Sequence, residues 1–207
     1  NDTANLVTWN PLANNRGAGT LTVGNTVLTD SDTTRNICHT TRKIPDSGKW
    51  CMAFTVSAHG TGDWELGINL ADDAVVGNAP GSNVDIEYWI QPDGTNYDMV
   101  KAGTSTIHDF ATVDTADEIW IALDQDNANI YMGIYDDSAA AMVWFANDGG
   151  VDGDPGAGTN PSYTSVTNDG GFIFASCSRD SVAQTILRSA NVSGTVPTGF
   201  TYLDGTD

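Results

Sequence analysis

Apolar and polar residues alternate over short stretches along most of this chain, a pattern typical of β-strands with two different faces. The clearest case is residues 118–136. Residues 119–123 form an unbroken apolar run, which is typical of a strand buried on both faces. The Asp and Asn residues of 124–129 are typical of a turn, because their side chains bond nearby backbone groups. We therefore expect a hairpin here, at the middle of a sheet.

Further strands are predicted by the same alternation. The even positions of residues 49–57 carry Trp, Met, Phe and Val, so this segment is expected to be a half-buried strand. It is expected to pair with residues 37–44 as a hairpin around the turn at 45–48. The other predicted elements are a hairpin at 21–29 and strands at 64–70, 84–90, 97–100, 106–110, 139–146, 171–177 and 182–187. Turn signals recur roughly every ten residues, which favours an antiparallel β-sandwich over βαβ units.

The composition agrees with an all-β fold. Three Glu and three Lys are present in the whole chain, whereas exposed helix surfaces are normally filled with Glu, Lys, Gln and Arg. Asp, Asn, Gly, Ser and Thr, which favour turns and strand ends, are abundant. A β-sandwich of 207 residues often forms one undivided domain. We expect a single antiparallel β-sandwich over residues 1–207, with little or no helix.

The charge of the chain is strongly negative. Eight Lys and Arg residues stand against 27 Asp and Glu residues, for a formal net charge of -19. Phosphate binding needs clustered Lys and Arg, so the charge argues against nucleic-acid partners and against anionic membrane surfaces. No apolar run approaches the roughly 18 residues that span a bilayer, so membrane insertion is not expected.

The three cysteines are Cys38, Cys51 and Cys177, and an odd number leaves at least one thiol outside any disulfide. If residues 37–44 and 49–57 pair as predicted, Cys38 and Cys51 lie about 13 Å apart along the ladder at the usual strand rise. That distance exceeds the reach of a disulfide. We expect three buried free thiols, without the spacing of metal ligands.

Several stretches together resemble the SPRY-like, concanavalin A-like sandwich modules of bacteriophage structural proteins. The hairpin at 118–135 resembles the core of the family, and TWNP at 8–11 with SGKW at 47–50 resembles its opening. VWFAN at 143–147, with the Gly-, Asp- and Pro-rich segment after it, and PTGF at 197–200 resemble its second half. The likeness covers nearly the whole chain in order.

The resemblance implies a non-enzymatic binding or structural module on phage tails, fibres or capsid surfaces. We therefore expect a virion-surface, extracellular module for host attachment. Its partner would be a host surface glycan or a neighbouring virion protein, met chiefly through the loops 60–64, 71–83 and 147–160. The analogy with phage fibres also suggests a homo-oligomer, such as a trimer. Two alternatives stay open: a glycan hydrolase or lyase, active or degenerate, on the same scaffold, and a purely structural decoration protein of capsid or tail.

Residues 83–87 (NVDIE) bear on the enzymatic alternative. They resemble the Glu-x-Asp-x-Glu strand of laminarinase-type endoglucanases, in which alternation aims three acids at one face. Here Asn83, Asp85 and Glu87 would share that face, and Asn83 matches the position of the nucleophile. A retaining mechanism needs two carboxyls about 5–5.5 Å apart, and an amide cannot form the glycosyl ester. We expect no catalytic residues, and Asp85 and Glu87 are candidates for ligand binding.

Three acids of one loop suggest a cation site. Asp148, Asp152 and Asp154 lie in the segment NDGGVDGDPG, and Ca²⁺ takes six to eight oxygen ligands, several of which such Asp residues can supply. The spacing lacks the DxDxDG order and the distal Glu of a calcium loop, so an acidic turn without metal is the alternative. No other cofactor is expected.

Aromatic residues beside Asp and Asn are candidates for stacking on sugars, because sugar sites combine apolar ring faces with hydroxyl acceptors. Core packing is the alternative role for each of them. The candidates are Trp64, Trp89, Tyr97 and Trp144. The histidines His39, His59 and His108 lie far apart, and neither a Gly-x-Ser-x-Gly elbow nor a His-Glu-x-x-His motif accompanies them.

Overall fold

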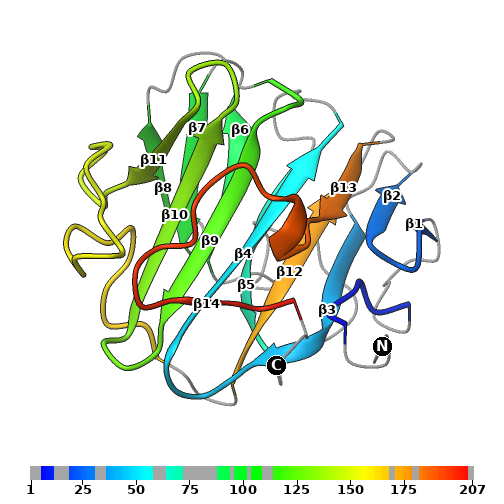
Figure 1. Cartoon of the computed structure of the whole chain (residues 1–207), viewed down its shortest axis with the longest axis horizontal. Coiled ribbons are helices and arrows are strands. Elements are labelled where there is room, and N and C mark those ends of the chain that lie inside the picture. Colours follow the sequence, from blue (N-terminus) through cyan, green and yellow to red (C-terminus); the bar gives the residue numbers. More distant parts are fainter. Residues whose placement is uncertain are drawn as a thin grey trace.

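The computed structural model describes residues 6–11, 19–30, 36–57, 64–71, 88–93, 96–101, 104–108, 114–167, 171–178 and 182–204. These residues form two sheets packed face to face, so the predicted all-β sandwich is confirmed (Figure 1). Within the described ranges there is no α-helix, and a 3₁₀ turn, η2 (Ser189–Asn191), follows the last long strand. No helix in this part of the chain has the length and apolarity needed to cross a membrane.

The first sheet has eight strands and contains the predicted central hairpin. That hairpin is β9 and β10, and β9 lies inside the sheet, between β10 and β4. Residues 139–146 contribute a strand, as predicted, and the short hairpin around Gly24 and Asn25 is also present. In spatial order the strands are β1 (Gly19–Thr22), β2 (Val27–Asp30), β13 (Ala183–Ile186), β4 (Lys49–Val56), β9 (Glu118–Asp124), β10 (Asn129–Asp136) and β11 (Ala141–Phe145), with β14 (Thr201–Tyr202) pairing in parallel with β4.

The second sheet has six strands, all in antiparallel pairs. An antiparallel backbone bridge between Trp9 and Thr40 places the N-terminal segment beside the first strand of this sheet. The spatial order is β3 (Asn36–Ile44), β12 (Phe172–Ser178), β5 (Trp64–Leu70), β6 (Tyr88–Asp93), β7 (Asn96–Lys101) and β8 (Thr104–His108).

The predicted hairpin of residues 37–44 with 49–57 is wrong. β3 pairs with β12 in the six-stranded sheet, whereas β4 pairs with β9 and β13 in the eight-stranded sheet. The turn at 45–48 therefore carries the chain from one layer to the other, so the apolar faces of β3 and β4 meet across the core instead of lying side by side. Alternation identifies a strand and its inner face, but it does not say which sheet the strand joins. The cysteines are nevertheless buried and none forms a disulfide, as predicted.

The main core lies between the two sheets. The inward residues of β9 and β10, such as Ile121 and Met132, pack there with Met52 and Phe54 of β4 and with Phe174 of β12. Trp9 stacks on Phe54, with ring centroids 5.8 Å apart. Each Å² of apolar surface that this layer removes from water favours folding by roughly 25 cal/mol.

The outer face of β4, β9 and β10 is buried as well, so β4 is not the half-buried strand that its pattern predicts. Residues 187–204, which we call the C-terminal strap, run across this face (Figure 1, red). The strap packs Val196, Phe200 and Tyr202 over Trp120 and Tyr131. A second, smaller core therefore lies outside the eight-stranded sheet.

Polar groups fix the strap to the sheet. Glu118 is 3% exposed, and its carboxylate accepts the N–H groups of Ser193 (2.5 Å) and Gly194 (3.0 Å) and the indole N–H of Trp120 (3.0 Å). The hydroxyl of Tyr202 accepts the backbone N–H of Ala53 at 3.0 Å and donates to the carbonyl of Leu187 at 3.0 Å. These bonds satisfy buried donors and hold the strap in one register on the sheet.

Candidate functional site

A pocket of about 230 Å³ opens where the strap meets the edge of the eight-stranded sheet. Three segments far apart in the sequence line it: Met142 and Trp144 of β11, residues 154–156, and residues 195–198 of the strap. We call it the Trp144 pocket. Its walls are mostly apolar, and Asp154 is the only ionisable residue among those that line it.

The first wall is the edge strand β11. Trp144 pairs with Gly133 of β10, and a Cβ built on Gly133 would lie 2.7 Å from Cε3 of Trp144. The absence of a side chain at Gly133 therefore leaves room for the indole on the outer face of the sheet. The carbonyl of Trp144 accepts the N–H of Gly153 at 3.0 Å, which brings the following loop back against the strand. Trp144 is 8% exposed.

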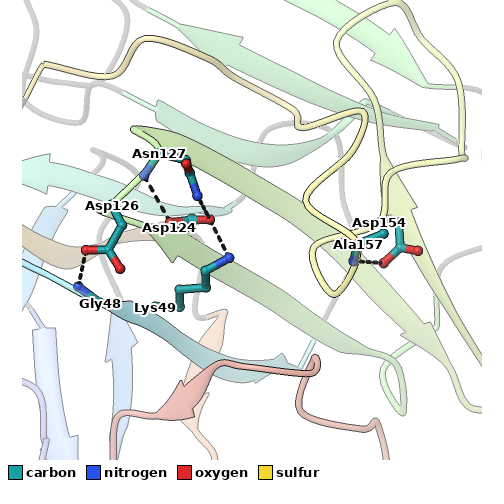
Figure 2. Close-up of polar contacts among 7 residues, drawn as sticks. All are labelled: Gly48, Lys49, Asp124, Asp126, Asn127, Asp154 and Ala157. Carbon is teal, nitrogen blue, oxygen red and sulfur yellow. Dashed lines mark hydrogen bonds and ion pairs between the residues drawn. The ribbon is translucent and has the colours of Figure 1, made fainter.

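The second wall is the loop that follows β11. One carboxylate oxygen of Asp154 accepts the N–H of Ala157 at 2.9 Å (Figure 2). Asp154 and Thr159 also exchange backbone hydrogen bonds of 3.0 Å in each direction. The loop also lies close to the strap, since a Cβ built on Gly156 would lie 3.7 Å from Cβ of Thr198. Asp154 itself is exposed. The loop is thus shaped by local bonds of a kind that Asp commonly makes.

The third wall is the strap, and Glu118 positions it. The two backbone N–H groups that Glu118 binds belong to Ser193 and Gly194, directly before the lining residue Thr195. A Cβ on Gly194 would lie 2.8 Å from Nε1 of Trp120, so the backbone here rests on the indole and only Gly fits. The pocket therefore depends on a contact between the central hairpin and the C-terminal strap.

Lys49, which lies beside the strap residue Phe200, is already paired. Nζ of Lys49 lies 2.8 Å from a carboxylate oxygen of Asp124 and 5.6 Å from the ring centroid of Phe200. Asp124 also accepts the backbone and side-chain N–H groups of Asn127 (Figure 2). Burial by itself would raise the pKa of Asp124, but the hydrogen bonds from Lys49 and Asn127 outweigh it and lower the pKa. Lys49 therefore stabilises the turns at this end of the sandwich through its ion pair with Asp124.

The aromatic candidates separate into two groups. Trp64 (1% exposed) and Tyr97 (0%) face the main core, where their ring centroids lie 6.0 Å apart, so neither presents a ring face for sugar stacking. Trp89 is 4% exposed on the other face of the six-stranded sheet, packed with Val100, and its indole N–H donates to Gln91 at 3.1 Å. Packing is the role that these three positions show. Trp144 is the candidate that lines a pocket.

The acidic candidates also fall into two groups, those outside the described residues and those whose contacts the structure shows. Asp85 and Glu87, with Asn83 and His59, lie outside the described residues. Asp148 accepts the N–H of Gly150 at 3.0 Å, and Asp152 accepts the side-chain N–H of Asn160 at 3.1 Å. In the described part of the chain no three His, Cys, Asp or Glu side chains gather to hold a metal, so the geometry gives the predicted calcium site no support.

His39 and the thiol of Cys38 do not pair with each other as base and nucleophile: the thiol lies against backbone carbonyls, of Asn10 and of His39 itself. His39 is 5% exposed on the six-stranded sheet, and burial lowers its pKa to about 4. Its Nε2 lies 3.4 Å from the side-chain amide nitrogen of Asn69. Burial raises the pKa of Cys38 and of Cys51 to about 12, which leaves both thiols protonated and unreactive at neutral pH.

Residue types alone singled out Trp144 and Asp154 as candidates, and the structure places both in one pocket. Sequence reasoning missed Met142 and the strap residues 195–198. Thr195, Val196 and Pro197 have no periodicity and no polar motif, so nothing in the sequence marks them as a wall of a site.

Comparisons with known proteins identify the fold. No protein-family model matches the sequence, and the search of curated proteins gives no match. Among solved structures, the chain is similar to the TRIM65 PSpry domain, with a TM-score of 0.60 and 10% identity over 88% of this chain and 90% of that chain. It is also similar to the SPRY domain of human HERC1, with a TM-score of 0.59 and 12% identity over 87% of this chain and 98% of that chain.

A stonustoxin structure is similar as well, with a TM-score of 0.56 and 12% identity, covering 87% of this chain and 28% of that chain. At these identities the likeness shows the fold alone. The SPRY-like β-sandwich expected from the sequence is confirmed, and the bacteriophage context expected with it stays a prediction.

Proposed function

We propose that this chain is a non-enzymatic binding module that holds a partner protein in the Trp144 pocket. The observation that carries the proposal is the convergence of β11, the 154–156 loop and the strap on an apolar recess with one carboxylate. Ligand sites combine an apolar lining with a few placed polar groups, and sites for whole small molecules usually measure about 300–1,000 Å³. A recess of about 230 Å³ suits one anchoring side chain of a larger partner.

The chemistry of the lining supports binding without catalysis. Nucleophilic catalysis usually needs a nucleophile within hydrogen-bond reach of a base that activates it. Glycoside hydrolysis likewise needs a pair of carboxyls. Asp154 stands alone among the residues that line the pocket, so the recess offers recognition but no proton relay.

The location that we propose is a virion surface outside the cell. Its support is the resemblance of the sequence to phage-type SPRY-like modules. In that setting the partner is a neighbouring virion protein or a host surface protein. A homotrimer, as in phage fibres, belongs to the same proposal.

A host glycan is a second candidate partner. The observation in its favour is that Trp144, Asp154 and the threonines Thr195 and Thr198 line the same recess, which combines an aromatic ring with hydroxyl and carboxylate groups. The low exposure of Trp144, 8%, favours the protein partner, because stacking on a sugar uses an open ring face.

The test is a pair of screens with variants that block the pocket. The purified chain is screened against a random peptide library and against a glycan array, the latter with and without Ca²⁺. Thr198→Trp fills the pocket, and Thr201→Trp is the matched control, because Thr201 is an exposed threonine of the same strap that does not line the pocket. We expect the wild type and Thr201→Trp to bind the same peptides and Thr198→Trp to lose them. Peptide binding that survives in Thr198→Trp would contradict the proposal, and glycan binding lost only in Thr198→Trp would favour the second candidate.

A further inference from the structure

Resting on the proposed function, we infer that the Trp144 pocket selects a Lys or Arg side chain of its partner protein. The methylene stem lies against Trp144 and Met142, and the cationic head meets the carboxylate of Asp154. Three properties of the described residues lead to this partner chemistry: the unpaired charge in the pocket, the shape and lining of the recess, and the acidic surroundings.

The charge of Asp154 is not neutralised by any described Lys or Arg. The carboxylate accepts the N–H of Ala157 at 2.9 Å, and no ion pair reaches it within the described ranges. Lys49 is committed to Asp124 at 2.8 Å, and Figure 2 shows it pointing to that carboxylate, with Asp154 in a separate loop. Asp154 lines the recess and is exposed, so its carboxylate can accept a charge-assisted hydrogen bond from a cationic partner.

The lining suits an aliphatic stem that ends in a cation. Long basic side chains bury their methylenes on apolar surface while the head reaches a polar group. Trp144 provides an indole for cation–π attraction, and Met142, Val196 and Pro197 provide apolar walls. The low exposure of Trp144 admits a narrow side chain more readily than the flat face of a sugar ring.

The same arrangement already occurs on this face of the sheet. Lys49 reaches Asp124 at 2.8 Å while its Nζ lies 5.6 Å from the ring of Phe200. A lysine between a carboxylate and an aromatic ring is thus a combination that this fold accommodates, and the Trp144 pocket offers the carboxylate and the ring without the cation.

The surroundings of the pocket favour basic partners and repel acidic ones. The formal net charge is -19. Next to the pocket, Asp152 forms a backbone bridge with the lining residue Trp144, so a further acidic residue lies beside the recess. Charge complementarity of this kind raises association rates and excludes like-charged partners.

The test uses the whole chain and two small probes, blocked arginine (N-acetyl-arginine methylamide) and its neutral isostere, blocked citrulline. Binding is followed by NMR on the indole N–H signal of Trp144 in ¹⁵N-labelled protein, assigned with Trp144→Phe. We expect blocked arginine to shift this signal saturably and blocked citrulline to bind about threefold to tenfold more weakly, the range of an exposed charge contact supplemented by a ring.

Asp154→Asn should lower the affinity for blocked arginine by a similar factor. Asp148→Asn is the matched control: Asp148 is also exposed and also accepts a backbone N–H, from Gly150 at 3.0 Å, but it does not line the pocket. Asn keeps the accepting oxygen, so both turns should persist. The control variant should bind blocked arginine like the wild type.

Equal binding of the two probes, no saturable shift with either, or equal effects of Asp154→Asn and Asp148→Asn would overturn the inference. If the proposed function itself is wrong, the two experiments give a different pattern of results. If Thr198→Trp still binds the library peptides, the pocket is not the site. If Thr198→Trp loses them while blocked arginine gives no response, the pocket is the site and the inferred side chain is wrong.

Discussion

Replacing Glu118 with Ala should loosen the C-terminal strap and with it the third wall of the Trp144 pocket. The carboxylate is 3% exposed and accepts three N–H groups, from Ser193, Gly194 and the indole of Trp120. Two of these donors, on Gly194 and Trp120, belong to buried residues, and each buried donor left without an acceptor costs about 1–3 kcal/mol. The expected loss in the free energy of unfolding is therefore about 2–6 kcal/mol.

Chemical denaturation followed by tryptophan fluorescence measures this loss, and a thermal melt should show a fall in Tm on the order of 10 °C for a chain of this size. Glu118→Gln keeps one accepting oxygen and should lose about half as much. Asp137→Ala, a change at an exposed acid of the same region, is the control. If Glu118→Ala is within about 1 kcal/mol of the control, the strap is not held by this carboxylate and the reasoning fails.

Three further predictions concern the sheets and the pH dependence of the fold. His39 has a pKa of about 4 in the folded chain against 6.5 for the free side chain, so the unfolded state binds an extra proton between these values and stability rises with pH across them. His39→Asn should remove about 3 kcal/mol of the difference in unfolding free energy between pH 4 and pH 7, and an unchanged pH slope would contradict the assignment. Ser162→Ala should lower the free energy of unfolding by about 2 kcal/mol in a denaturant titration. The buried hydroxyl accepts the N–H of Met132 at 2.8 Å and donates to the carbonyl of Phe145 at 2.7 Å. Ser47→Ala, at an exposed serine, is the control and should be neutral. Gly133→Ala should lower the free energy of unfolding by about 1–3 kcal/mol and displace the indole of Trp144, because the new Cβ would lie 2.4 Å from a carbonyl oxygen. Unchanged stability together with an unmoved NMR signal of Trp144 would refute this packing.

The sequence was sufficient to predict the sandwich and its central hairpin, because alternation and turn chemistry are local signals. Residues 119–123 are apolar without a break, and both faces of β9 are buried as predicted, by the main core and by the strap. The partition of strands between the sheets was not predictable in the same way. β3 and β4 follow each other with a four-residue turn, yet they join different layers, and this choice depends on long-range pairing with β12 and β9.

The candidate site was predictable only in part. Trp64 shares the apolar parity of Leu66 and Ile68, so its place in the core was implicit in the alternation that identified the strand. Trp144 and Asp154 could be selected by residue type, but the pocket exists only because the strap crosses the sheet and rests on Trp120. No periodicity in residues 187–200 indicates that crossing. The site is a tertiary feature built from locally unremarkable segments.

The most direct test of the binding proposal is calorimetric titration of a library-selected peptide into three proteins: the wild type, Thr198→Trp and Thr201→Trp. A pocket that anchors the partner predicts a loss of affinity of at least about tenfold in Thr198→Trp, because the anchoring side chain of such an interface carries much of the binding energy. The Thr201→Trp control should match the wild type within about twofold, as expected for a change outside the anchoring contact. Equal affinities for all three proteins would place the binding surface elsewhere on the sandwich.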